Sequence, residues 1–393
     1  MRVPFLDLTR QGKRVREAVD REIGAVFDSQ QFVLGRMVEA FEEAFCQSVG
    51  CAQAVGMSSG TDAQLAILMA MGIGAGDAVI TTPYTFFATA GCIHRTGAEP
   101  VFVDIRPDTF HMDAERLREC LQRLARPDEG RLRTPRGNVV RAVIPVHLFG
   151  ACCDMDALRD AVAPYDLPII EDAAQAFGAG YRSAGVARCA GSIADFAFFS
   201  FFPTKNLGGA GDGGMAVCRD RTFAEKLRLL RNHGMGERNF HRVVGGNFRL
   251  DALQAAVLHA KLPFVEGWNA ARRRIAALYQ STLSDLSEAL KLPADPWNNA
   301  GLENHHTWHQ YVIRADRRDE LLRHLQQEEI GHAVYYPIPL HRQECFAYLG
   351  CRDGDFPEAE RAARESVALP IFAGLREEEI EMIATALHRF YLR

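Results

Sequence analysis

Residues 142–172 read AVIPVHLFGACCDMDALRDAVAPYDLPIIED, in which two apolar runs enclose a segment of helix length. The runs are Ala142–Val146 and Pro168–Asp172, and the segment between them includes Met155–Ala163. Both runs are apolar almost throughout, which is typical of strands buried on both faces of a sheet. The stretch therefore predicts two neighbouring parallel strands connected by a helix.

The same alternation extends in both directions, from about Ala52 to Val217. Asp62–Met71 is a further segment of helix length between apolar runs. The other runs are Gln53–Met57, Ala78–Thr81, Pro100–Asp104, Asp195–Phe201 and Met215–Cys218. We therefore predict an α/β fold with a doubly wound, mostly parallel, seven-stranded sheet flanked by helices. In such a fold a ligand is expected in the crevice at the carboxyl ends of the strands.

The pattern changes after about Asn247. A helix over Asp251–Leu262 leads to Pro263, and a second helix continues to about Leu290. Beyond it the sequence predicts a strand and two helices, over His309–Arg314, Arg318–Glu329 and Arg376–Tyr391. We predict a large domain over residues 1–262 and a smaller C-terminal α+β domain over residues 263–393.

Composition limits the class of protein. The chain has 393 residues, 48% of them hydrophobic and 24% charged, with a formal net charge of −5. These values are typical of a globular protein and give no basic footprint for nucleic acid. We find no apolar signal core or membrane span. Ten scattered cysteines without a C-x-x-C motif indicate reduced thiols and a cytoplasmic location. The Arg-, Gly- and Pro-rich segment Arg126–Asn138 is predicted to be an exposed loop.

One lysine stands apart from the others. Lys plus Arg number 45, but only five are lysines: Lys13, Lys205, Lys226, Lys261 and Lys291. Lys205 follows a predicted strand, in FFSFFPTKNLGG (198–209), among aromatic residues and glycines. Burial lowers the pKa of a lysine, and the neutral amine is a nucleophile that arginine cannot replace. The alternative is a lysine whose stem lies on the surface while its charge stays in water.

Three further motifs follow predicted strands. Glu171 and Asp172 alternate between sheet faces, so one carboxylate can enter the crevice and hold a pyridinium nitrogen, although Asp172 also suits a helix N-cap. Ser58-Ser59-Gly60-Thr61-Asp62 opens a helix, which suits either an anion site or plain capping. An aromatic residue of Thr82–Phe87 suits either a cofactor ring or the core.

Two other patterns suggest different chemistry. His305-His306-Thr307-Trp308-His309 resembles a metal site, but a strand would place His306 on the opposite face from the other two histidines. We expect no metal there. Gly72–Asp77 is glycine-rich but precedes a strand, whereas a dinucleotide-binding loop follows one.

Taken together, the motifs resemble the DegT/StrS family of sugar-nucleotide aminotransferases. These enzymes use pyridoxal 5′-phosphate (PLP) and have the aspartate aminotransferase fold, called fold type I. The resemblance extends from Val3–Leu8 to Ala368–Pro370. The matching motifs are Ser59–Thr61, Glu171–Gln175, Ser200 with Thr204-Lys205, Gly213-Gly214 and Gly246–Arg249.

The resemblance implies a role for each matching residue. Lys205 would bond covalently to PLP and transfer protons, and Asp172 would pair with the pyridine nitrogen. Gln175 would lie near the ring hydroxyl, and Phe86 would stack on the ring. The phosphate would be held by Gly60, Thr61 and Ser200 of one subunit and Asn247 of the other, which implies a homodimer with shared active sites. Substrate contacts would come from Arg249, Tyr335, Tyr336 and His341.

The implied activity is transfer of an amino group from an amino acid, with L-glutamate as the expected donor, to a nucleotide-linked keto sugar. Residues 335–341 favour a 3-keto sugar, and PLP would alternate with pyridoxamine phosphate (PMP). Two alternatives stay open: a PLP-dependent sugar dehydratase or lyase, and a non-catalytic sugar-binding regulator with the same fold. The dehydratases in this family carry histidine where Lys205 stands here.

Overall fold

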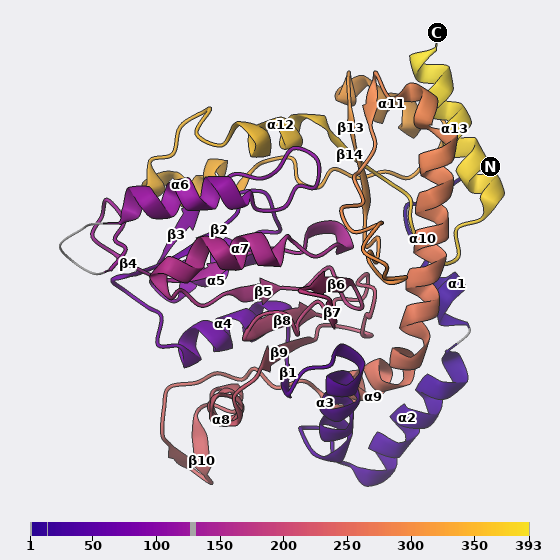
Figure 1. Cartoon of the computed structure of the whole chain (residues 1–393). Coiled ribbons are helices and arrows are strands. Elements are labelled where there is room, and N and C mark those ends of the chain that lie inside the picture. Colours follow the sequence, from indigo (N-terminus) through magenta and orange to yellow (C-terminus); the bar gives the residue numbers. More distant parts are fainter. Residues whose placement is uncertain (1, 14, 126–130, 393) are drawn as a thin grey trace.

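The computed structural model describes residues 2–13, 15–125 and 131–392, and a seven-stranded sheet lies at its centre (Figure 1). The strands are β1 (Gln53–Met57), β2 (Asp77–Thr81), β3 (Glu99–Phe102), β4 (Val139–Ile144), β5 (Ile170–Asp172), β8 (Phe196–Ser200) and β9 (Gly214–Cys218). Each coincides with or overlaps a predicted run. Their order is β3-β2-β4 and β5-β8-β9-β1, and parallel bridges from Val143 to Ile169 and from Val146 to Asp172 join the two halves.

Strand β9 is antiparallel to both of its neighbours, while the other strand pairs are parallel. The chain reverses between β8 and β9 through a loop rather than a crossover helix, and that loop carries Lys205. The predicted α/β class with a mostly parallel sheet is confirmed, and the reversed strand is a detail that the apolar pattern did not indicate.

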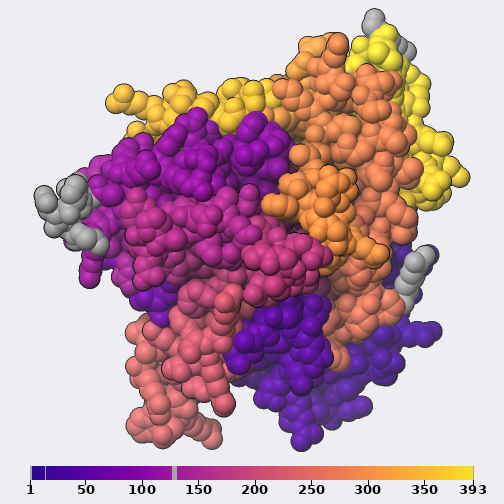
Figure 2. Space-filling view, viewed as in Figure 1, coloured from indigo at the N-terminus to yellow at the C-terminus, as the bar shows by residue number. Residues whose placement is uncertain are grey.

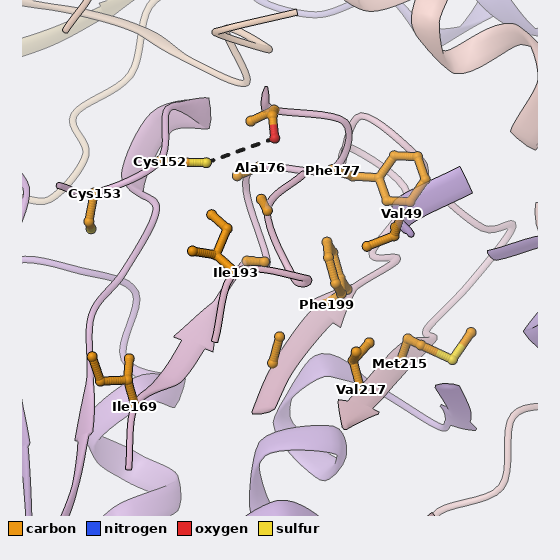
Figure 3. Packing of buried hydrophobic residues seen from close by; sticks show 14 of the residues in the cluster. Val49, Cys152, Cys153, Ile169, Ala176, Phe177, Ile193, Phe199, Met215 and Val217 are labelled. Carbon is orange, nitrogen blue, oxygen red and sulfur yellow. Dashed lines mark hydrogen bonds between the residues drawn. The ribbon is translucent and has the colours of Figure 1, made fainter. Parts of the chain in front are cut away.

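Helices cover both faces of the sheet. One face packs against α4 (Gly60–Ala70), α5 (Ala88–Arg95) and α8 (Arg221–Arg231). The other packs against α3 (Arg36–Val49), α6 (Ala114–Leu124), α7 (Met155–Val162) and α9 (Ala252–Lys261). In the second core, Phe199 lies among Val49, Phe177 and Ile193, with Met215 and Val217 on the adjoining strand (Figure 3). Burial of these side chains fixes the sheet whose edge forms the site.

The C-terminal region has its own core around a three-stranded antiparallel sheet. Its elements are β12 (Leu290–Lys291), β13 (Tyr311–Ala315), β14 (Ser366–Leu369), α10 (Val265–Thr282), α11 (Arg318–Gln327) and α13 (Glu377–Tyr391). Val3 belongs to this core, and Arg10 forms an ion pair of 2.7 Å with Glu379. The start of the chain thus packs on its end (Figure 1), while the division at 262/263 stays a prediction.

The remaining elements are short or peripheral. They are α1 (Leu8–Gly12), α2 (Arg16–Ser29), α12 (Pro357–Glu365), β6 (Gly180–Ser183), β7 (Val186–Cys189), β10 (Met235–Glu237) and β11 (Phe240–His241). The segment that contains α12 crosses back over the large sheet region, where Asp104 accepts hydrogen bonds from the N–H groups of Glu358 and Ala359. Figure 2 shows this gold segment lying along the purple helices and the salmon β10–β11 hairpin projecting from the body.

Two expectations about surface and membrane can be compared with the structure. Residues 126–130 of the predicted loop Arg126–Asn138 lie outside the described residues. In its remainder Leu132 and Thr134 are buried, so that part is not simply exposed. Among the described helices none has both the length and the apolar character needed to cross a membrane.

Candidate active site

The motifs from the sequence meet at one edge of the sheet. Asp172 ends β5, Ser200 ends β8 and Lys205 lies in the loop that follows. The Ser58–Thr61 motif follows β1, and Phe86 follows β2. This edge holds the carboxyl ends of the parallel strands, which is where the α/β architecture places ligands.

The start of α4 forms an anion cradle. Ser59 caps the helix by accepting a hydrogen bond from the N–H of Asp62 at 3.0 Å, while the N–H groups of Gly60 and Thr61 have no acceptor within the helix. A Cβ atom on Gly60 would lie 2.8 Å from the Cβ of Ser200, and one on Gly214 would lie 2.3 Å from the carbonyl oxygen of Ser59. The glycines therefore let the helix start, Ser200 and β9 come close enough to surround a phosphate.

The two adjacent carboxylates have separate environments. Glu171 is fully buried and accepts hydrogen bonds from the N–H groups of Gly191, Ile193 and Ala194, and it also lies 3.0 Å from His147. These bonds tie the 190–194 loop to β5. Glu171 thus has a structural role.

Asp172 lies on the opposite face. It accepts hydrogen bonds from the Thr89 hydroxyl at 2.8 Å and from the N–H of Ala174 at 3.2 Å. Burial raises the pKa of Asp172, an effect that the Thr89 bond and the charge of Lys205 oppose. A buried carboxylate with so few donors is suited to a cationic partner such as a pyridinium N–H.

Lys205 is partly buried, and burial lowers the pKa of its amine to about 8, although the charge of Asp172 acts in the opposite direction. The neutral fraction of the amine near physiological pH is therefore much larger than that of an ordinary lysine. Two other lysines donate hydrogen bonds to backbone carbonyls. Lys261 donates to Gly208 at 2.7 Å, and Lys226 donates to Ala70. Lys205 is the nucleophile candidate of the site.

Aromatic and amide side chains complete the site. The Phe86 side chain is 58% exposed, and its ring centroid lies 6.4 Å from that of Tyr336. Gln175 donates to the Tyr336 hydroxyl at 3.0 Å and accepts from the N–H of Phe149 at 2.9 Å. Gln175 and Tyr336 thus join the predicted ring site to the predicted substrate site.

Tyr84 is a residue that the sequence reasoning did not single out. Its buried hydroxyl donates to the carbonyl of Tyr335, accepts from the N–H of Tyr336 at 2.9 Å and lies 2.9 Å from the Ser366 hydroxyl. It therefore fixes the Tyr335–Tyr336 segment against the loop after β2. Its place directly after that strand, between Pro83 and Phe86, was the available signal.

Three predicted residues come from outside the strand ends that carry Lys205 and Asp172, and the carbonyl of Phe248, between Asn247 and Arg249, accepts a hydrogen bond from the N–H of Ser58 at 2.9 Å. Asn247 is exposed, and Arg249 donates to the Asn232 side chain at 2.8 Å. His341 is buried, packs on Phe356 and lies 3.2 Å from Glu360, so its hydrogen-bond partner belongs to α12. The roles of Asn247, Arg249 and His341 stay predictions.

The histidine run 305–309 is divided among three environments. His305 lies 2.7 Å from Asp295, His306 stacks on Trp308 at 3.7 Å between centroids, and His309 lies 3.0 Å from the Asn206 side chain. Across the described ranges no cluster of three or more His, Cys, Asp or Glu side chains has a metal-ligating arrangement.

Two curated relatives are similar to the chain over nearly its whole length. A pleiotropic regulatory protein of Geobacillus stearothermophilus is 40% identical over 100% of this chain and 99% of its own. A UDP-N-acetyl-3-dehydro-alpha-D-glucosamine 3-aminotransferase of Acidithiobacillus ferrooxidans is 40% identical over 98% of this chain and 97% of its own.

Two solved structures have the same fold. DesV of S. venezuelae, solved with a ketimine intermediate, superposes with a TM-score of 0.90 at 38% identity and covers 100% of this chain and 99% of its own. NtdA of Bacillus subtilis, solved with bound PMP, superposes with a TM-score of 0.86 at 27% identity and covers 100% of this chain and 86% of its own. The predicted fold type I architecture is confirmed.

The sequence also matches the DegT/DnrJ/EryC1/StrS aminotransferase family over residues 13–388. This match spans both cores and every motif that lines the site. The chain therefore belongs to the DegT/DnrJ/EryC1/StrS aminotransferase family.

Proposed function

We propose that the protein is a PLP-dependent aminotransferase that transfers the amino group of L-glutamate to carbon 3 of a nucleotide-linked keto sugar. The observation that carries the proposal is the pair Lys205 and Asp172 at one edge of the sheet. Lys205 has a pKa lowered to about 8, and Asp172 is a buried carboxylate without a cationic hydrogen-bond partner among the described residues.

The residues present fit PLP in five respects. The helix start at Gly60 and Thr61 suits its phosphate, and Phe86 exposes a flat ring for its pyridine. Asp172 suits the ring nitrogen, and Gln175 offers an amide beside the ring position. Lys205 supplies the amine that holds the cofactor covalently.

When bound, PLP supplies an electron sink for the carbanion formed at the donor's α-carbon. Asp172 would keep the ring nitrogen protonated because its buried negative charge favours a proton on that partner. Lys205 would take the proton from the donor's α-carbon and deliver it to the C4′ carbon of the cofactor. In the second half-reaction, with the keto sugar bound, Lys205 would move a proton in the reverse direction. With a pKa near 8, Lys205 has both protonation states available for the two directions.

The sugar assignment is supported by the relatives and by the site. The Acidithiobacillus relative is named for amination of a 3-dehydro sugar nucleotide. Tyr336 lies beside Phe86 and Gln175, so a substrate stacked near the cofactor would meet its hydroxyl. We propose that Tyr335 and Tyr336 contact the sugar. His341 follows in the same chain segment, where it is buried and lies 3.2 Å from Glu360 of α12.

We further propose a homodimer in the cytoplasm. Asn247 of each subunit would reach the phosphate of the other, and Arg249 would contact the sugar nucleotide. The segment before Asn247 is strongly exposed, at 88% for Val244 and 69% for Phe240, as expected of a surface that a second copy covers. All ten cysteines are free, which suits a reducing compartment.

The decisive experiment follows each half of the reaction. L-Glutamate should convert the PLP band to that of PMP with release of 2-oxoglutarate, and a panel of nucleotide-linked 3-keto and 4-keto sugars should show which one restores the PLP band. Lys205→Ala should abolish turnover and the borohydride-reducible visible band, whereas Lys291→Ala should keep both. Normal turnover by Lys205→Ala would overturn the proposal.

A second candidate function is a non-catalytic regulator, which the name of the Geobacillus relative favours. The retained pair of Lys205 and Asp172 argues for catalysis, because neither group is needed merely to bind a sugar. A colourless purified protein that binds sugar nucleotide but releases no 2-oxoglutarate would favour the regulator. A PLP-dependent dehydratase or lyase would be coloured but would also release no 2-oxoglutarate from glutamate.

A further inference from the structure

A buried polar network begins at the residue that follows Lys205. The Nδ2 of Asn206 donates to the Oδ1 of Asn269 at 2.7 Å and to the carbonyl of Thr307 at 3.0 Å, while its Oδ1 faces the Nδ1 of His309 at 3.0 Å. Asn206, Asn269 and His309 are all buried. The network joins the Lys205 loop to α10 and to the segment before β13.

Backbone carbonyls fix the direction of every bond in this network. The carbonyl of Thr307 can only accept, so Asn206 must present its Nδ2 there and its Oδ1 to His309. Asn269 is oriented in the same way, because its Nδ2 donates to the carbonyl of Phe177 at 3.1 Å. His309 must therefore carry its hydrogen on Nδ1 and donate it to Asn206.

His309 stands beside Lys205 as a neutral ring. Burial lowers the pKa of His309 far below its usual value, and the positive charges of Lys205 and Arg272 act in the same direction. Arg272 comes from α10, where it donates to the carbonyls of Trp308 and Ile371. The charged groups around Lys205 are thus Asp172 on β5 and Arg272 behind His309, with Lys261 bonded to the same loop at Gly208.

The segment that carries His309 also bonds to the opposite side of the site. The N–H of Thr307 donates to the carbonyl of Gly150 at 2.8 Å, and that of Gln310 donates to the carbonyl of Phe149 at 3.3 Å. Phe149 in turn donates its N–H to Gln175. One short segment therefore holds both the loop after Lys205 and the loop beside Gln175.

We propose that Asn206 and His309 are positioning residues for Lys205: their hydrogen bond fixes the turn that carries the amine and forms an uncharged wall that limits water beside it. The inference rests on the proposed function, because it takes Lys205 to be the reacting amine. Neither residue needs to touch the substrate to act in this way.

The test measures the basicity of Lys205 directly. The full-length protein is treated with hydroxylamine to free every lysine amine, trace-labelled with acetic anhydride between pH 6 and 11, and analysed by peptide mass spectrometry. In the wild type, the midpoint of the Lys205 acetylation curve against pH should lie near pH 8. Lys13, Lys226 and Lys291 serve as internal references within the same sample, whereas Lys261 is left out because it bonds to the same loop at Gly208.

His309→Leu removes the donor, so water should enter and the Lys205 midpoint should rise by about 1 pH unit, while the reference lysines stay unchanged. In the glutamate half-reaction kcat should fall about tenfold or more with little change in KM. His309→Asn places an amide N–H near the Nδ1 position and should restore part of both values. His306→Leu, a buried histidine of the same segment without a bond to Asn206, is the matched control and should behave as wild type.

An unchanged Lys205 midpoint and kcat in His309→Leu would overturn the proposal. If that variant does not fold, Asn206→Ser is measured in the same way, and an unchanged midpoint overturns the proposal there. A wild-type Lys205 that titrates with the reference lysines, in a protein that releases no 2-oxoglutarate, would instead contradict the proposed function.

Discussion

Glu171 and Asp172 are neighbours in sequence with the same charge and similar burial, yet their partners differ. Glu171 accepts three backbone N–H bonds that hold the 190–194 loop, whereas Asp172 accepts the Thr89 hydroxyl and one backbone N–H. Strand alternation alone indicated that one of them faces the crevice. The partners determine which one it is.

This difference predicts opposite effects of two matched amide substitutions. Asp172→Asn should keep the thermal midpoint within a few degrees but lower kcat by about 100-fold or more, because the ring nitrogen loses the charge that keeps it protonated. Glu171→Gln should lower the midpoint, because one amide cannot accept all the bonds of the carboxylate, and stability falls by about 1–3 kcal/mol. Differential scanning calorimetry and half-reaction rates measure the two effects. The reverse pattern would exchange the assigned roles.

The lowered pKa of Lys205 predicts a pH-dependent stability effect in the cofactor-free protein. Folding lowers this pKa from the ordinary 10.5 to about 8, so the charged amine costs folding free energy below pH 8. The cost fades between pH 8 and 10.5, where the folded amine is already mostly neutral, and it is gone once the unfolded amine has also lost its proton. Lys205→Met should therefore raise the thermal midpoint by about 1–3 °C at pH 7.

That gain should shrink as the pH rises and vanish near pH 10.5. The exposed Lys291→Met is the control, since it removes a lysine without relieving burial. Thermal melts of both variants against wild type at four pH values between 7 and 10.5 provide the measurement. A gain for Lys205→Met that is constant with pH would show that packing, and not charge, causes it.

At the scale of elements, the start of α4 and β9 form a single unit around the phosphate position. Gly214→Ala would place a methyl group 2.3 Å from the Ser59 carbonyl, so the helix start must shift. We expect the variant to bind PLP at least tenfold more weakly, because the N–H groups of Gly60 and Thr61 lose their alignment. Titration of the full-length protein with PLP, followed by fluorescence, measures the affinity.

Gly267→Ala is the matched control for that substitution, because a Cβ there meets nothing within 4 Å. It should bind PLP as wild type does. Equal affinities of the Gly214→Ala variant and the wild type would place the phosphate elsewhere.

The elements also show why some features were predictable and others were not. Each of the seven sheet strands could be predicted, because burial on both faces leaves a continuous apolar run such as Ala142–Val146. The reversal of β9 could not, because Met215–Cys218 is equally apolar in either direction. The hairpin β6–β7 has few buried side chains and so lacks an apolar pattern.

The site residues that directly follow strands could be predicted, whereas those whose partners are distant in the sequence could not. Lys205, Asp172 and Gly60 stand at strand ends or helix starts, which local sequence indicates. His309 acts through Asn206, 103 residues away, and Tyr84 reaches Tyr335 across 251 residues. Pairings at that separation depend on the packing of the C-terminal region against the sheet, which no local pattern encodes.

At the scale of the whole molecule, the exposed β10–β11 hairpin and the segment that follows it predict that each active site uses two subunits. The β10–β11 hairpin projects from the body (Figure 1), and Asn247, which follows it in the sequence, is exposed. If Asn247 reaches the phosphate of the other subunit, Lys205→Ala and Asn247→Asp damage different subunits' contributions to one site. Each variant alone should be inactive, the first for want of an amine and the second because a carboxylate repels the phosphate.

Mixing the two variants under conditions that exchange subunits should then restore activity. Half of the random dimers are mixed, and each mixed dimer has one site with both Lys205 and Asn247 intact, so about a quarter of wild-type activity per subunit should return. Size-exclusion chromatography with light scattering verifies the dimer, and 2-oxoglutarate release measures the recovery. Two copies of Lys205→Ala mixed under the same conditions are the control. An inactive mixture that nevertheless contains dimers of both variants would mean that each site is complete within one chain.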